Sequence, residues 1–215
     1  MRAPIGLNTG ESGEERTVPG WAGWCLLVGG IVLAYACYAT AYGPGLRCHA
    51  AVQLSQTHRS QAEQYLVQAA TADPLAVDPP NSLAALAFQA WKADPSPEAA
   101  RRVERFTELA ISRAPRSAAA YRSAGDSYWE MYQRTRDPRW LQKALAAYGR
   151  TVELYPNSAV SRAQFAIALR ESGSLREFQT EREKALWLDE TTPHLDKKLP
   201  AELRKSLQRS NSQRK

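Results

Sequence analysis

The spacing of apolar residues changes twice along the chain and divides it into three parts. From Thr17 to Leu46, thirty successive residues carry no charge. From about residue 50 to residue 190, small and large apolar residues recur three and four positions apart, as in amphipathic helices. The remaining residues are rich in Lys and Arg. The pattern predicts one hydrophobic helix, then an all-α domain, then a basic tail at 191–215 with a short helix.

The hydrophobic segment at 21–42 is predicted to be a transmembrane helix in contact with membrane lipid. It is apolar on every side. At about 1.5 Å per residue it is long enough to cross a hydrocarbon core of roughly 30 Å. Tryptophans mark its first end and tyrosines gather toward the other, as interfacial anchors do. Gly43-Pro44-Gly45 is predicted to end the helix.

A cleaved signal peptide is the alternative, because Ala39-Thr40-Ala41 resembles a cleavage site. Two features favour an uncleaved single-pass anchor. Residues 1–20, predicted to be disordered, lack the positive charge of a signal peptide, since three glutamates oppose two arginines. The apolar run is also longer than that of a signal peptide. Positive charges are level on the two sides, and we expect the soluble domain on the extracytoplasmic side.

Three prolines divide the helical part into units of equal length. Pro74, Pro115 and Pro156 are 41 residues apart, and each closes a similar helical pattern. The unit after Pro115 begins with a large, small, small, large pattern, at Tyr121, Ala124, Gly125 and Tyr128. Such a small pair allows another helix to approach closely.

Together, these small residues and closing prolines resemble the tetratricopeptide repeat (TPR) family. That family repeats every 34 residues or so, so we interpret the longer units as repeats with insertions, one of them around Gln133–Pro138. The resemblance implies a short α-solenoid of antiparallel helix pairs, which we place at 46–190. A generic helical bundle with helix-ending prolines would show the same apolar periodicity.

In TPR proteins the first helices of the pairs line a groove that receives a protein partner. The resemblance implies groove positions that include Phe88, Trp91, Arg122, Asp126, Trp129, Glu130 and Arg170. Aromatic and arginine side chains are common anchors of binding surfaces. Trp91 and Trp129 fit equally well as core residues that pack against the insertions, and the sequence leaves both interpretations open.

A second resemblance is narrower and concerns cellular context. Ala41-Tyr42-Gly43-Pro44 after the hydrophobic segment, and Leu186–His194 near the end of the repeats, are similar to the C-terminal part of planctomycete-type O-antigen ligase/polymerase membrane proteins. Those proteins carry a polytopic glycan-transfer domain before a TPR tail. Only the last span and the tail would match, so the resemblance implies an envelope context in a bacterium and no transferase activity.

Candidate chemistry is sparse. The three cysteines and three histidines show no metal-ligand spacing, and no phosphate-binding loop or nucleophile motif occurs. We therefore predict no catalytic residue, no metal site, no cofactor and no small-molecule substrate. Of the net charge of +6, the tail at 191–215 supplies +5. The arginines of the helix around Arg101–Arg113 are mixed with glutamates, so we predict no nucleic-acid partner.

The sequence thus predicts a membrane-anchored interaction or scaffolding module of the cell envelope, with a protein partner in or near the membrane. The alternative is a detached accessory domain of a glycan-assembly protein of the O-antigen ligase/polymerase type. A stand-alone enzyme is the third possibility, and no constellation of residues favours it.

Overall fold

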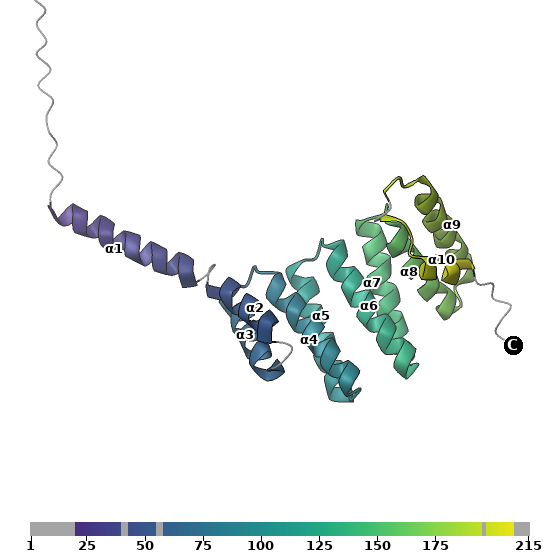
Figure 1. The fold of residues 1–215 in the computed structure, drawn as a ribbon, viewed down its shortest axis with the longest axis horizontal. Coiled ribbons are helices and arrows are strands. Elements are labelled where there is room, and N and C mark those ends of the chain that lie inside the picture. The colour runs from purple at the N-terminus through teal and green to yellow at the C-terminus, as the bar shows by residue number, and fades with distance from the viewer. Residues whose placement is uncertain (1–19, 40–42, 55–57, 195–196, 209–215) are drawn as a thin grey trace, which may run out of the picture.

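The described part of the chain is helical throughout and contains no strand. The computed structural model describes residues 20–39, 43–54, 58–194 and 197–208. Its helices, in chain order (Figure 1), are α1 (Gly20–Cys37), α2 (Gly43–Leu54), α3 (Arg59–Ala72), α4 (Asp78–Ala93), α5 (Pro97–Arg113), α6 (Ala118–Thr135), α7 (Pro138–Leu154), α8 (Ala159–Ser172), α9 (Leu175–Thr191) and α10 (Ala201–Gln208). The predicted all-α class is confirmed.

Eight of these helices form antiparallel pairs that stack side by side: α2 with α3, α4 with α5, α6 with α7, and α8 with α9 (Figure 1). The predicted prolines lie in the turns after α3, α5 and α7, two residues beyond each helix end. Polar caps start the next helices. Ser96, Ser117 and Ser158 each accept a hydrogen bond from a backbone N–H three residues on.

The sequence-based boundaries need two corrections. Gly43–Gly45 does not lie outside the array: it begins α2, where Pro44 is tolerated because the first backbone N–H groups of a helix lack partners anyway. The residues interpreted as an insertion around Gln133–Pro138 do not form a separate element. They lengthen α6 to 18 residues and α7 to 17, and the chain turns at Arg136 in the left-handed conformation, with φ of 57°. By comparison, α8 has 14 residues and ends at Ser172, directly before Gly173.

The core consists of two apolar clusters. One extends from α3 to α8, where it includes Ala168, and the other joins α8, α9 and α10. The small pair predicted in α6 has the expected use, because Gly125 lies directly under the ring of Tyr148 from α7. A Cβ at Gly125 would come within 2.6 Å of that ring.

The predicted transmembrane helix is not confirmed. No helix in the described residues is both long enough and apolar enough to cross a membrane. The predicted span corresponds to α1, whose regular α-helical part has 18 residues. It is therefore about 27 Å long, whereas a hydrocarbon core is about 30 Å thick. Tyr38 and Ala39 continue it in a π-helical turn, and positions 40–42 of the predicted span lie outside the described residues, as does the predicted disordered segment up to residue 19.

The short helix predicted in the basic tail is present as α10, and it crosses α8 instead of stacking beyond α9 (Figure 1). Buried Leu199 and Leu207 fix its two ends. The buried carboxylate of Asp189 accepts a hydrogen bond of 2.7 Å from the backbone N–H of Leu199 and forms an ion pair with Arg204. Arg170 of α8 donates to the carbonyl of Ser206 at 2.7 Å.

Candidate partner-binding site

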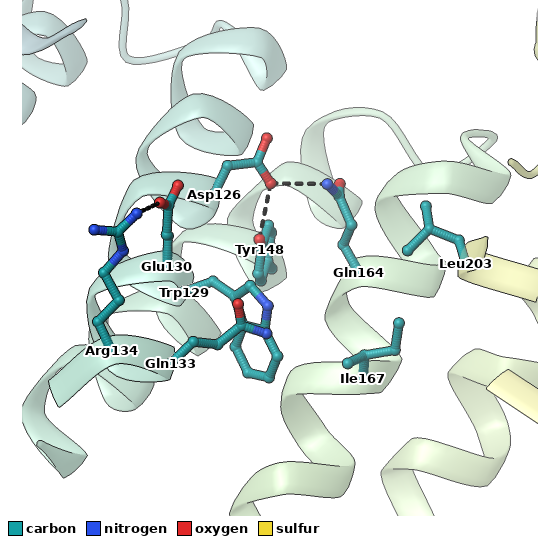
Figure 2. A pocket seen from close by; sticks show the side chains of 9 residues that line it. All are labelled: Asp126, Trp129, Glu130, Gln133, Arg134, Tyr148, Gln164, Ile167 and Leu203. Atoms are coloured by element: carbon teal, nitrogen blue, oxygen red, sulfur yellow. Dashed lines mark hydrogen bonds and ion pairs between the residues drawn. The ribbon is translucent and has the colours of Figure 1, made fainter. Parts of the chain in front are cut away.

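The first helices α6 and α8 enclose a pocket of about 510 Å³, closed at one side by α10 (Figure 2). We call it the α6–α8 pocket. Its lining residues are Asp126, Trp129, Glu130, Gln133, Arg134, Tyr148, Gln164, Ile167 and Leu203. It therefore combines two aromatic rings and two aliphatic side chains with charged and amide groups.

Asp126 is the centre of the polar side of the pocket. Its Oδ1 accepts a hydrogen bond from the Tyr148 hydroxyl at 2.8 Å and another from Gln164 Nε2 at 2.8 Å, a bridge between α6 and α8 visible in Figure 2. Burial raises the pKa of the Asp126 carboxyl, while the Tyr148 hydrogen bond and the charge of Arg122 oppose that rise. The carboxylate is therefore partly desolvated and held in one orientation.

Tyr148 reaches this pocket from the second helix of its pair. Its ring is 2% exposed and passes over Gly125, where any side chain would collide with it. Burial, the charge of Asp126 and the hydrogen bond to Asp126 raise the pKa of Tyr148 well above its ordinary value, so the phenol remains a neutral donor. Its hydroxyl is fixed by the packing of the pair.

The positively charged side chain in the pocket wall, that of Arg134, already has partners within the chain. Arg134 forms an ion pair of 2.9 Å with Glu130 and donates to the carbonyl of Lys92 at 3.3 Å. Its guanidinium carbon also lies 5.8 Å from the centre of the Trp91 ring. Lys92 approaches Glu130 to 3.6 Å. These contacts join α4 to α6 and neutralise the Glu130 carboxylate.

The two tryptophans at matching groove positions have different environments. Trp91 is 1% exposed and stacks on Phe88, with ring centroids 5.9 Å apart. Trp129 is only partly buried, packs against Tyr132 at 5.8 Å between centroids, and lines the α6–α8 pocket. Trp91 thus belongs to the core, whereas Trp129 lines the pocket. The groove interpretation of Trp129 stays a prediction.

The structure divides the predicted groove residues among four places. Asp126, Trp129 and Glu130 meet at the pocket, whereas Phe88 and Trp91 belong to the core cluster. Arg122 lines a neighbouring cavity between α6, α7 and α8, and Arg170 faces α10 and the ring of Phe178. That any of them contacts a partner stays a prediction.

Several pocket residues were missed from the sequence. The sequence pattern does not single out Tyr148 as a pocket residue, although the Gly125 opposite it is a usable signal. Leu203 lies in α10, and nothing in the sequence indicated that this helix folds back onto α8. The other missed residues are Gln133, Arg134 and Gln164. Gln133 and Arg134 lie in the stretch interpreted as an insertion.

The described residues contain no group of three or more His, Cys, Asp and Glu side chains that could hold a metal ion. The chemistry available at the α6–α8 pocket is recognition by hydrogen bonds, charge and an aromatic surface.

Comparison with solved structures shows a likeness of fold at low sequence identity. A MamA crystal structure superposes with a TM-score of 0.54 at 17% identity, over 73% of this chain and 84% of that one. MamA from AMB-1 gives a TM-score of 0.53 at 15% identity, over 71% and 76%. The TPR protein TTC0263 of Thermus thermophilus gives 0.48 at 18% identity, over 76% and 79%. No family model matches the sequence, and no curated protein matches it.

These likenesses concern the fold of the helical pairs. The MamA superpositions support the predicted stack of helix pairs as a fold. The narrower resemblance to O-antigen ligase/polymerase proteins has no support among them.

Proposed function

We propose that this chain is a membrane-attached TPR-like scaffold that binds a protein partner at the α6–α8 pocket. One observation carries the proposal: Trp129, a residue type that dominates binding hot spots, faces a pocket beside an oriented carboxylate. An aromatic ring with a polar rim is the arrangement by which protein interfaces gain both affinity and orientation.

The surface of α1 supports membrane attachment. Large apolar side chains on all its sides are exposed, among them Leu26, Ile31 and Leu33 at 76%, 61% and 66%. An apolar helix without a polar face is stable in a lipid environment, where its backbone hydrogen bonds are satisfied internally. Trp21 and Tyr35 stand near its two ends, at the depth where amphipathic rings favour the bilayer interface.

The partner proposal is tested by capture from solubilised membranes with the full chain as bait. Trp129→Ala should remove the captured partner, because the hot-spot ring is lost. Trp187→Ala is the matched control, since Trp187 is 62% exposed on α9 and does not line the pocket. Equal capture by both variants would refute partner binding at this pocket.

Membrane attachment is tested separately by alkaline extraction of isolated membranes. The wild-type chain should stay in the pellet, and Leu26→Arg with Ile31→Arg should release it, because a charge in the bilayer centre costs several kcal/mol. Extraction of the wild-type chain into the supernatant would contradict insertion of α1.

The side of the membrane follows from protease protection in intact and opened cells. We expect α2–α10 on the extracytoplasmic side of the membrane. Protease should therefore reach them when the outer layers of the envelope are opened and the membrane that holds α1 stays intact. The glycan-assembly context rests on the sequence motifs at 41–44 and 186–194, and we assign no catalytic step to the chain.

A further inference from the structure

The α6–α8 pocket offers more hydrogen-bond acceptors than its own residues use. Both donors to Asp126 converge on Oδ1, and among the described residues no hydrogen bond reaches Oδ2. The Oε1 of Gln164 is buried and has no partner among those residues. A buried acceptor without a donor costs free energy, so Gln164 Oε1 favours a ligand that brings N–H groups. Asp126 is an exposed residue, so its Oδ2 is open to a further donor from such a ligand.

The charges of the pocket favour a cation. Of its charged lining residues, Glu130 and Arg134 neutralise each other at 2.9 Å. Arg122 influences Asp126 through its charge, but it lines the neighbouring cavity and is not part of this lining. Lys92 also approaches Glu130, to 3.6 Å, but it does not line the pocket. Among the charged residues of the lining, Asp126 is therefore the one without an ion pair to another described residue.

The apolar surfaces suit a long side chain. Trp129, Ile167 and Leu203 line the part of the pocket beside the Asp126–Gln164 bridge (Figure 2). The methylene stem of an arginine or lysine buries well against such surfaces while its charged end reaches polar groups. An aromatic face near a carboxylate also attracts a cation directly.

We infer that the α6–α8 pocket receives a basic side chain of the partner, best an arginine. Its guanidinium donates to Asp126 Oδ2 and Gln164 Oε1, and its stem packs on Trp129. Arginine fits better than lysine because its planar fork can satisfy two separate acceptors at once. The inference rests on the proposed function, since it names the chemistry of the partner at that same site.

The test uses N-acetylarginine amide and the neutral, equally shaped N-acetylcitrulline amide as probes. The full chain is kept in detergent micelles, and the indole N–H signal of Trp129 is identified by its loss in Trp129→Phe. The arginine probe should shift this signal saturably, and the citrulline probe should bind about tenfold or more weakly, because only the charged donor meets the carboxylate fully.

In Asp126→Asn, the affinity for the arginine probe should fall to the affinity for the citrulline probe. Glu153→Gln is the control, because it removes the same charge from an exposed site on α7 and should leave the preference unchanged. Equal responses to the two probes in the wild-type chain, or an arginine preference that survives Asp126→Asn, would overturn the inference.

The two proposals fail in different ways. If Trp129→Ala abolishes partner capture but the probes show no preference, the partner site stands and its cation specificity is wrong. If the probes show the preference while capture is unaffected by Trp129→Ala, the pocket chemistry stands and the proposed function is wrong.

Discussion

Trp91 and Trp129 occupy the same position in successive helix pairs, yet Trp91 is buried in the core and Trp129 lines the α6–α8 pocket. The cause lies in the pair that follows each of them. Arg134, in the last turn of α6, extends over the ring of Trp91. The matching position in the next unit is Leu175, which is already in α9, because α8 ends a turn earlier at Ser172. The length of a neighbouring helix thus decides whether a repeated tryptophan is covered or available.

Removing each tryptophan should give the largest contrast in stability. Trp91→Ala is expected to lower the free energy of unfolding by about 3–5 kcal/mol, because it leaves a large cavity in the core. Trp129→Ala should cost clearly less, since its ring is partly exposed. Urea unfolding followed by circular dichroism measures both. Equal losses would mean that Trp129 is a core residue and that the comparison is wrong.

The glycine in α6 should rank next. Gly125→Ala is expected to cost about 1–3 kcal/mol, because its Cβ would collide with the Tyr148 ring. Gly149→Ala in α7 is the matched control. Its Cβ would lie 3.6 Å from Phe165, an ordinary contact, so the better helix propensity of alanine should make it neutral or stabilising by up to about 1 kcal/mol. Thermal unfolding of both variants checks the difference. A neutral Gly125→Ala would contradict the close approach.

Tyr148→Phe should have a smaller effect, confined to the pocket with Trp129. It removes one hydrogen bond to Asp126, which is worth about 1 kcal/mol. Because that bond lowers the pKa of Asp126, its loss should raise this pKa further. Carboxyl NMR titration reads the change directly. An unchanged Asp126 titration would show that the hydroxyl does not reach the carboxylate.

The smallest expected effect is the pH dependence that Asp126 imposes on stability. Since burial raises its folded-state pKa above its unfolded value, the native chain binds the proton more tightly. Its contribution to stability is complete below the unfolded pKa of about 3.9 and is lost as pH rises through the folded pKa. Asp126→Asn should remove this decline. Unfolding midpoints of the wild-type chain and of Asp126→Asn, measured between pH 3.5 and about pH 6, test this. Parallel curves of midpoint against pH would contradict the raised pKa of Asp126.

Local rules were enough to predict the repeat architecture. The prolines at the turns and the small pair in α6 are consequences of helix termination and close packing, which act over a few residues. The α6–α8 pocket was predicted only in part, through Asp126, Trp129 and Glu130. The rest of its lining depends on how elements far apart in the sequence are arranged. Two features set it: α6 is longer than α8, and α10 returns across α8, so that Leu203 lines the same pocket as Ile167.

The passage of Tyr148 over Gly125 has a consequence for how such arrays diverge. The hydroxyl that orients Asp126 comes from a helix whose own surface lies behind the binding face. A substitution at Gly125 touches no ligand, but it would move this hydroxyl and change what the pocket recognises. In a selection for altered partners, variants at this packing position would be recovered together with variants of the pocket itself. Positions of a repeat that are usually regarded as structural can therefore contribute to the choice of partner.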